Sequence, residues 1–282
     1  MTIQWFPGHM AKAIRLIKES LNQVDVVIEL VDARIPESSR NPVLDETVTD
    51  QPRVLVLMKP DMADPQVTKQ WLQHYRNLGQ TALTIDAKKN VGISELIAAV
   101  TELAEPKMEK LRKKGIQHRS VRAMIVGIPN VGKSTLINRL VGKNQATTGN
   151  KPGVTRKNQW LKVGKKLELL DTPGILWPKF EDQTVGLRLA ATGAIKDERL
   201  DFSDVVLYLI RYMQEYYPKS LLERYKLQEE PEHEVGWFEE IGRKRGCLMG
   251  GGDIDFDATA ELILREYRSE KLGRISLERP EQ

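Results

Sequence analysis

The sequence predicts an α/β fold, with a doubly wound, mostly parallel sheet followed by an all-helical region. Two observations carry this prediction. Short apolar runs with the composition of buried parallel strands alternate with helical patterns in the first part of the chain. The strand pattern stops after about residue 180, and residues 183–282 read as mostly helical. We therefore expect a sheet domain over residues 1–180 and a helical domain over residues 181–282.

Apolar spacing places each element of the sheet domain. An amphipathic helix is predicted over residues 10–22, because Ile14, Ile17 and Leu21 recur on one face. A hairpin with strands at 159–163 and 167–171 is predicted as well. Buried strands are predicted at 24–31, 54–57, 82–85 and 123–126, with helices at 66–78 and 93–113.

The chain carries a small net positive charge, which alone does not identify the class of its partner. The 282 residues hold 43 Lys and Arg against 39 Asp and Glu, a formal net charge of +4. This excess permits an acidic partner such as RNA but does not require one. Basic residues gather in two clusters, which serve either as RNA contacts or as solvated surfaces. The first contains Lys107, Lys110, Arg112, Lys113, Lys114, His118, Arg119 and Arg122, and the second contains Arg243, Lys244 and Arg245.

Cysteine usage and hydropathy bear on the compartment. The one cysteine, Cys247, excludes an internal disulfide and fits a reducing cytoplasm. No apolar run approaches the ~20 residues that cross a bilayer, and the first residues lack the pattern of a signal peptide. We expect a cytoplasmic protein with no membrane partner.

A phosphate-binding loop follows the strand predicted at 123–126. Residues 127–134 read G-I-P-N-V-G-K-S, which fits G-x-x-x-x-G-K-S and opens a predicted helix at 135–140. Glycines in this motif let backbone N–H groups surround phosphates at a helix N-terminus. Lys133 would neutralise the outer phosphates, and Ser134 would bind Mg²⁺. A chance match is the alternative, which the strand–loop–helix context disfavours.

A second phosphate motif lies downstream, where residues 171–174 read D-T-P-G at the end of a predicted strand. Asp171 can hold Mg²⁺ through water there, and the Gly174 N–H can reach the γ-phosphate. Thr155 lies between this motif and the phosphate loop, where a switch threonine supplies a second hydroxyl to the metal. Ser134, Thr155 and Asp171 are therefore the candidate Mg²⁺ ligands.

The candidate base-reading motif is Met58-Lys59-Pro60-Asp61, at the end of the strand predicted at 54–57. GTPases read guanine with N-K-x-D, in which the aspartate accepts two N–H bonds that adenine does not offer. Asp61 supplies this carboxylate, and the stem of Lys59 packs over the base. Met58 replaces the asparagine, and the missing hydrogen bond is worth ~1 kcal/mol. The alternative is an aspartate that caps the following helix.

A further base contact is expected one strand later. Residues 86–88 read D-A-K and resemble the S-A-K loop, whose backbone N–H groups contact the guanine oxygen. The base-reading motifs thus precede the phosphate loop and D-T-P-G, whereas Ras-like GTPases have them last. This order predicts a circularly permuted P-loop GTPase domain, with an ATPase as the weaker alternative. The candidate GTP-binding residues are Met58, Lys59, Pro60, Asp61, Asp86, Ala87, Lys88, Asn130, Val131, Gly132, Lys133, Ser134, Thr135 and Gly174.

Several motifs together resemble one known family. The permuted order, W-F-P-G-H-M at residues 5–10, Asp32-Ala33-Arg34, the phosphate loop and D-T-P-G-I-L-W-P at 171–178 are similar to the ribosome biogenesis GTPase A family. These are bacterial circularly permuted GTPases with mitochondrial relatives. The resemblance covers essentially the whole chain, including residues 186–190 and 244–248. Met58 departs from the N-K-x-D of the family.

This resemblance implies a role in late assembly of the large, 50S ribosomal subunit. It implies that the helical domain binds ribosomal RNA and that the subunit stimulates GTP hydrolysis. GTP, GDP, the large subunit and its RNA are the implied partners, and we expect a monomer away from the ribosome. A signalling GTPase with protein effectors and no RNA contact is the alternative.

The group that positions the attacking water differs from that of Ras-like enzymes. Those enzymes orient water with a glutamine just after D-x-x-G, where this chain has Ile175. His9 is the candidate catalytic residue, because histidine titrates near neutral pH and the resemblance points to it. A histidine packed at the start of the first helix is the alternative. Asn130 is a candidate K⁺ ligand beside the transferred phosphate, or a loop asparagine kept for its backbone conformation.

Overall fold

The computed structural model describes residues 8–116, 119–142, 159–177, 180–195, 197 and 202–281, without the side chains of residues 8–12 and 159. These residues group into two compact units. The helical unit is Phe180–Leu277, and the sheet unit contains the other described residues, including 278–281. Among the described helices, none has the length and apolar character needed to cross a membrane.

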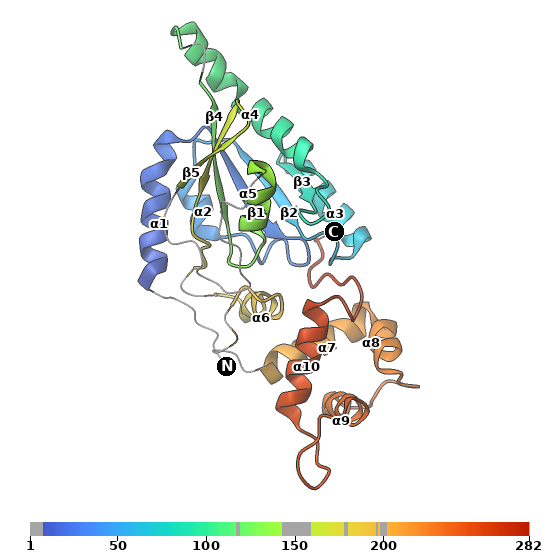
Figure 1. Ribbon diagram of the computed structural model, residues 1–282. Coiled ribbons are helices and arrows are strands. Elements are labelled where there is room, and N and C mark those ends of the chain that lie inside the picture. The colour runs from blue at the N-terminus through green and yellow to red at the C-terminus, as the bar shows by residue number, and fades with distance from the viewer. Residues whose placement is uncertain are drawn as a thin grey trace. The chain divides into compact units, whose positions relative to one another are not determined.

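Within the described residues, the sheet unit is built on one six-stranded sheet with strand order β3-β2-β1-β4-β6-β5 (Figure 1). Neighbouring strands pair in parallel except β5 and β6, which form an antiparallel pair. The strands are β1 Val26–Asp32, β2 Arg53–Met58, β3 Thr81–Ile85, β4 Val121–Gly127, β5 Gln159–Val163 and β6 Leu167–Asp171. The predicted doubly wound, mostly parallel sheet is confirmed.

Helices connect these strands. α3 begins where the Asp64 carboxylate accepts hydrogen bonds from the Gln66 and Val67 N–H groups. α4 begins after Gly92, which has a φ of 86°, and it continues through Pro106. The helices are α1 Gly8–Ser20, the short 3-10 helix η1 Leu21–Gln23, α2 Pro42–Thr47, α3 Pro65–Asn77, α4 Ile93–Lys113 and α5 Lys133–Val141. The sequence pattern did not predict α2, which is short.

The core fixes the positions of β1 and β2. Leu55 and Leu57 of β2 form one buried cluster with Val31 of β1 and with Trp71 and Tyr75 of α3. α4 packs against β1, β3 and β4. Right-handed crossovers in opposite directions along the sheet place α3 and α4 on opposite faces. The carboxyl ends of the parallel strands therefore meet at one fixed edge, where ligands of such sheets bind.

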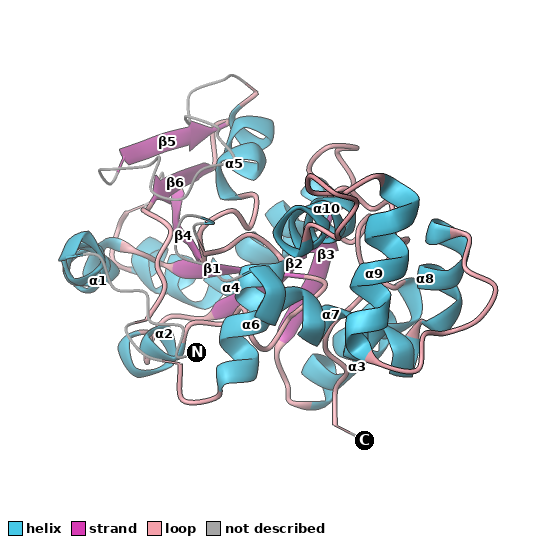
Figure 2. Cartoon of the chain, turned by 90° about the horizontal axis from the view of Figure 1, so that it is seen from below, coloured by secondary structure: helices cyan, strands magenta, loops and turns pink. Residues whose placement is uncertain are grey.

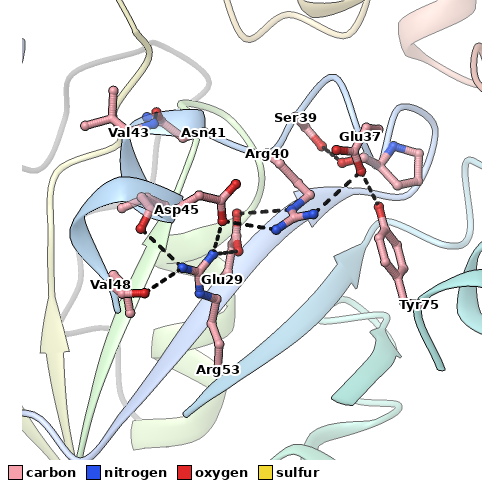
Figure 3. Close-up of polar contacts among 12 residues, drawn as sticks. Glu29, Glu37, Ser39, Arg40, Asn41, Val43, Asp45, Val48, Arg53 and Tyr75 are labelled. Carbon is pink, nitrogen blue, oxygen red and sulfur yellow. Dashed lines mark hydrogen bonds and ion pairs between the residues drawn. The ribbon is translucent and has the colours of Figure 1, made fainter. Parts of the chain in front are cut away.

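A charged network lies on β1 beside α2 (Figure 3). Glu29 is buried in mid-strand, with Arg53 Nη1 3.2 Å and Arg40 Nε 3.8 Å from its carboxylate. Arg40 and Arg53 also pair with Asp45, at the surface. Burial raises the pKa of Glu29 in spite of the two arginines. This carboxyl group is therefore less stable as an anion than an exposed glutamate.

Residues 278–281 belong to the sheet unit because Glu278 is bound to the loop after β1. Its carboxylate accepts hydrogen bonds from the Glu37 N–H at 2.9 Å and the Ser38 N–H at 2.9 Å, and from the Ser38 hydroxyl. The Trp71 indole donates to the Glu278 carbonyl at 3.2 Å. Glu278 is 4% exposed, so it acts as a buried attachment point for the chain that leaves the helical unit.

The helical unit contains α6 Gln183–Ala191, α7 Phe202–Tyr216, α8 Pro218–Tyr225, α9 Glu234–Arg245 and α10 Phe256–Arg268. α7 packs against each of the other helices of this group, all of which are labelled in Figure 2. Trp237 and Phe238 of α9 are buried, so they belong to the core of the unit. The Asp255 carboxylate caps α10 by accepting the Ala258 N–H at 2.9 Å.

Candidate nucleotide-binding site

The phosphate loop has the backbone geometry that its motif requires. It joins the end of β4 to α5, which begins at Lys133. Asn130 and Gly132 both have a positive φ, 61° and 107°. A Cβ on Gly127 would come within 2.9 Å of the Leu30 carbonyl oxygen of β1. Left-handed residues before a helix N-terminus direct backbone N–H groups to one point, which is a site for phosphate.

Lys133 and Asp171 bring the phosphate loop and D-T-P-G together. Lys133 Nζ lies 2.6 Å from Asp171 Oδ1, and both side chains are almost fully buried. Burial lowers the pKa of Lys133, an effect that the charge of Asp171 opposes. The pair places one cation and one carboxylate beside the N-terminus of α5, where a phosphate and its metal would bind.

The residues at this point fit a magnesium ion. Mg²⁺ is held by few protein oxygens and keeps several waters. The buried Asp171 carboxylate and the half-buried Ser134, which follows Lys133 on α5, supply suitable oxygens. The ion would neutralise charge on the β- and γ-phosphates. Thr155, the third predicted ligand, lies outside the described residues, and so does the side chain of His9.

The D-T-P-G segment is bonded to the strand that carries the phosphate loop. The Thr172 hydroxyl donates to the Ile125 carbonyl at 2.6 Å, and the Ile175 N–H donates to the Gly127 carbonyl at 3.1 Å. A Cβ on Gly174 would come within 3.1 Å of the Pro129 backbone. Gly174 therefore lies directly against the phosphate loop. Ile175 is fully buried and has no polar group with which to orient water.

The base-reading motif begins at the end of β2. Met58 is 1% exposed, and a Cβ on Gly132 would lie 3.3 Å from its Cε. Met58 thus packs beneath the phosphate loop, where the usual asparagine would offer a hydrogen bond. Lys59 has a φ of 57°, which turns the chain out of the strand and through Pro60 toward Asp61. The Asp61 side chain is 13% exposed, with Lys88 Nζ 3.4 Å from its Oδ2.

The loop at residues 86–88 lies beside this carboxylate. The Asp86 carboxylate accepts the Lys88 and Lys89 N–H groups at 3.0 Å, so its role here is to shape the loop. Among the described residues, nothing accepts a hydrogen bond from the Ala87 N–H. That group could therefore donate a hydrogen bond to a guanine oxygen. Arg139 of α5 donates to the Ala87 carbonyl at 2.9 Å and to the Lys88 carbonyl at 3.2 Å.

The structure thus brings the predicted phosphate and base residues to one edge of the sheet. Arg139, which ties the base loop to the helix of the phosphate loop, was not among the predicted site residues. Its signal was weak, because an arginine in the second turn of α5 resembles a surface residue. The polar role of Asp32 was also missed, although its place at the end of a buried strand is typical of functional carboxylates.

Comparison with known proteins agrees with this geometry. The model of the family described as "50S ribosome-binding GTPase" matches residues 122–235. Ribosome biogenesis GTPase A from Bacillus cereus is 59% identical over 100% of this chain and 95% of its own length. The chain belongs to the ribosome biogenesis GTPase A family. It is therefore a GTPase, with its motifs in the permuted order.

Two further relatives extend this assignment. Mitochondrial ribosome-associated GTPase 1 from Bos taurus is 33% identical over 98% of this chain and 88% of its own length, so the family has a mitochondrial relative as expected. The solved structure of GNP-bound YlqF from T. maritima is 28% identical, with a TM-score of 0.63, over 96% of this chain and 99% of that one.

Proposed function

We propose that this GTPase promotes late maturation of the large, 50S ribosomal subunit, and that the subunit stimulates its GTP hydrolysis. Membership of a ribosome biogenesis family supports the general role. The proposed link between nucleotide state and partner binding rests on the close approach of Gly174 to the phosphate loop, where a Cβ on Gly174 would lie 3.1 Å from the Pro129 backbone. A γ-phosphate bound there would press on D-T-P-G, and the chain continues from that motif into the helical unit. The nucleotide state would thereby bias the partner-binding surface.

For RNA contact we propose the basic end of α9. Arg243, Lys244 and Arg245 are all exposed, and they are followed by the exposed Leu248 and Met249. Acidic partners pair with residues of both basic clusters. Near 107–122 the pairs are Lys107–Asp25, Arg112–Glu105, Lys113–Glu109, Arg119–Asp25 and Arg122–Glu168. On α9, Arg243 pairs with Glu240 at 3.1 Å and Arg245 lies 3.9 Å from Glu266, so pairing alone does not distinguish the two clusters and the choice between them needs an experiment.

A charge-reversal experiment tests this surface. The variant with glutamate at 243, 244 and 245 should bind 50S subunits weakly and with a shallower salt dependence, because fewer phosphate contacts release fewer counterions. The matched control places glutamate at Lys110, Lys113 and Lys114, which changes the net charge equally. Equal loss in both variants would mean a general charge effect. If the affinity of the wild type for the subunit does not depend on salt concentration, the alternative with protein effectors is favoured instead.

For hydrolysis we propose that His9 positions water, because the buried Ile175 has no group for that task. We also propose Mg²⁺ at Ser134, Thr155 and Asp171. Asn130 has a φ of 61°, and asparagine adopts this left-handed conformation more readily than most residues. The backbone conformation alone therefore explains an asparagine at this position. K⁺ at Asn130 therefore stays a prediction, tested by comparing hydrolysis in K⁺ and in Na⁺.

Bacterial relatives support a cytoplasmic location, and we expect a monomer away from the ribosome.

A further inference from the structure

Asp32 holds the lysine of the base-reading motif. It is the last residue of β1, it pairs in register with Met58 of β2, and it is 1% exposed. Its Oδ2 accepts a hydrogen bond from Lys59 Nζ at 3.0 Å and from Arg34 Nη2 at 2.8 Å. Its Oδ1 accepts the Arg34 N–H and Nε. One buried carboxylate therefore fixes the ends of two long cationic side chains.

The backbone of Asp32 is fixed as well. The Asp32 N–H donates to the Ser39 hydroxyl at 2.9 Å, and that hydroxyl donates to the Ile35 carbonyl at 2.7 Å. Burial alone would raise the pKa of Asp32, but the charges of Arg34 and Lys59 hold it well below its usual range. Asp32 is thus a rigid anion within a tight turn, which makes it a suitable anchor for a flexible side chain.

The anchor determines where the Lys59 stem lies. A free lysine has several rotatable bonds, and fixing them when a ligand binds costs conformational entropy. Here the Cα is fixed at the end of β2 and Nζ is fixed at the end of β1, so the methylene groups are held between them before a base arrives. Preorganisation of this kind strengthens binding without any new contact.

Met58 adds no polar contact to the base-reading motif. Its thioether side chain packs below Gly132 and cannot replace the hydrogen bonds of an asparagine. We propose that Asp32 is a positioning residue for guanine binding, acting through Lys59. The inference rests on the proposed assignment of residues 58–61 to the base.

The test separates base binding from phosphate binding. In Asp32→Asn, GDP affinity should fall about tenfold, since a charged anchor is lost. The affinity for Mg²⁺-tripolyphosphate, which reaches only the phosphate loop, should stay unchanged. Titration calorimetry measures both. Unchanged GDP affinity would overturn the proposal, and so would an equal loss for both ligands, because the effect would then be a general distortion of the site.

Asp25→Asn is the matched control. Asp25 is equally buried, lies just before the other end of β1, and pairs with Lys107 at 2.9 Å and Arg119 at 3.1 Å. Its neutralisation should lower stability while the ratio of GDP to tripolyphosphate affinity stays that of the wild type. The same change of ratio in both variants would make the effect of Asp32 a general result of losing a buried anion.

Two more variants cover a failure of Asp32→Asn to fold and an error in the base assignment. If Asp32→Asn does not fold, Lys59→Met keeps the stem and removes the anchored charge, and it should show the same selective loss of GDP affinity. Unchanged GDP affinity in Lys59→Met would overturn the proposal. Asp61→Asn tests the underlying assignment, because it should weaken GDP and admit xanthine nucleotide. Guanine preference retained in Asp61→Asn would reject the assignment itself, which is a different failure from that of Asp32.

Discussion

Lys133 and Asp171 form a buried ion pair, 2.6 Å between Nζ and Oδ1, where the phosphate loop meets D-T-P-G. The two groups proposed to bind phosphate and Mg²⁺ are thus each other's partners. Binding of Mg²⁺-GTP would exchange these partners, giving the ammonium a phosphate and the carboxylate a metal ion. Both charges remain compensated during the exchange, so the site can be buried without an isolated charge.

Because of this ion pair, Lys133→Ala should affect both nucleotide binding and stability. Nucleotide binding should be abolished, and the isolated Asp171 carboxylate should also reduce stability by about 3 kcal/mol. Calorimetric titration and urea unfolding measure the two effects. Adding Asp171→Asn should recover stability without recovering nucleotide binding. A folded Lys133→Ala protein with wild-type GTP affinity would refute the phosphate-loop assignment.

Met58→Asn should strengthen guanine-nucleotide binding by up to about tenfold, because one hydrogen bond to the loop is regained. The smaller side chain also leaves space below Gly132, so stability should fall by roughly 1–3 kcal/mol. GDP affinity and the urea midpoint are measured on the same preparation. If GDP binds no more tightly, Met58 is not in the position of the asparagine in N-K-x-D.

Glu278→Gln tests the attachment of residues 278–281. The neutral amide accepts the Glu37 and Ser38 N–H groups less strongly, and stability should fall by about 2 kcal/mol. Hydrogen exchange should also speed up in residues 35–40. Glu281→Gln, at an exposed position nearby, is the control and should change neither quantity. Equal exchange in the wild type and Glu278→Gln would show that this contact contributes nothing measurable.

Glu29 should make stability fall as the pH rises. Its pKa in the folded chain is raised above the ordinary 4.5, chiefly by burial. Its contribution is therefore fully present below that value and is lost as the pH rises through the folded pKa. The free energy of unfolding of the wild type minus that of Glu29→Gln should therefore decrease as the pH rises above the ordinary value of 4.5. A difference that increases with pH would mean that Arg40 and Arg53 outweigh burial.

His9→Ala should remove most of the stimulation of hydrolysis by the 50S subunit, on the order of 10²-fold, without changing GTP affinity. Catalysis depends on holding the water-positioning group close to its target, and binding to the subunit would hold the His9 side chain there. Single-turnover hydrolysis with saturating subunits measures the effect. If the subunit stimulates the variant fully, His9 does not position the water, and other groups such as ribosomal residues or K⁺ must promote hydrolysis.

Much of the sheet unit was predictable because β1, β2 and β4 are buried on both faces and read as continuous apolar runs. The helix at 93–113 was predicted with its observed bounds, although Pro106 lies inside it. α2 is too short to show a helical period, so its residues read as a loop. Residues 278–281 read as part of the helical domain, because the bonds between Glu278 and Ser38 join positions 240 residues apart.

The motifs identified the candidate site, but their spacing does not reveal which side chains hold one another. Asp32 and Lys59 come from different strands, and their contact depends on the parallel register of β1 and β2. Arg139 contacts the base loop because α5 lies beside it, about fifty residues later in the chain. Such contacts follow from tertiary packing, for which a motif carries no signal.

The most direct test of the central claim is co-sedimentation of the chain with 50S precursor particles, with GDP and with a non-hydrolysable GTP analogue. If the γ-phosphate acts through Gly174 on the helical unit, binding should be at least about fivefold tighter with the analogue, the lower range of allosteric coupling. It should also weaken with salt, as an RNA contact does. Equal binding with both nucleotides, or no binding to the particles, would contradict the account.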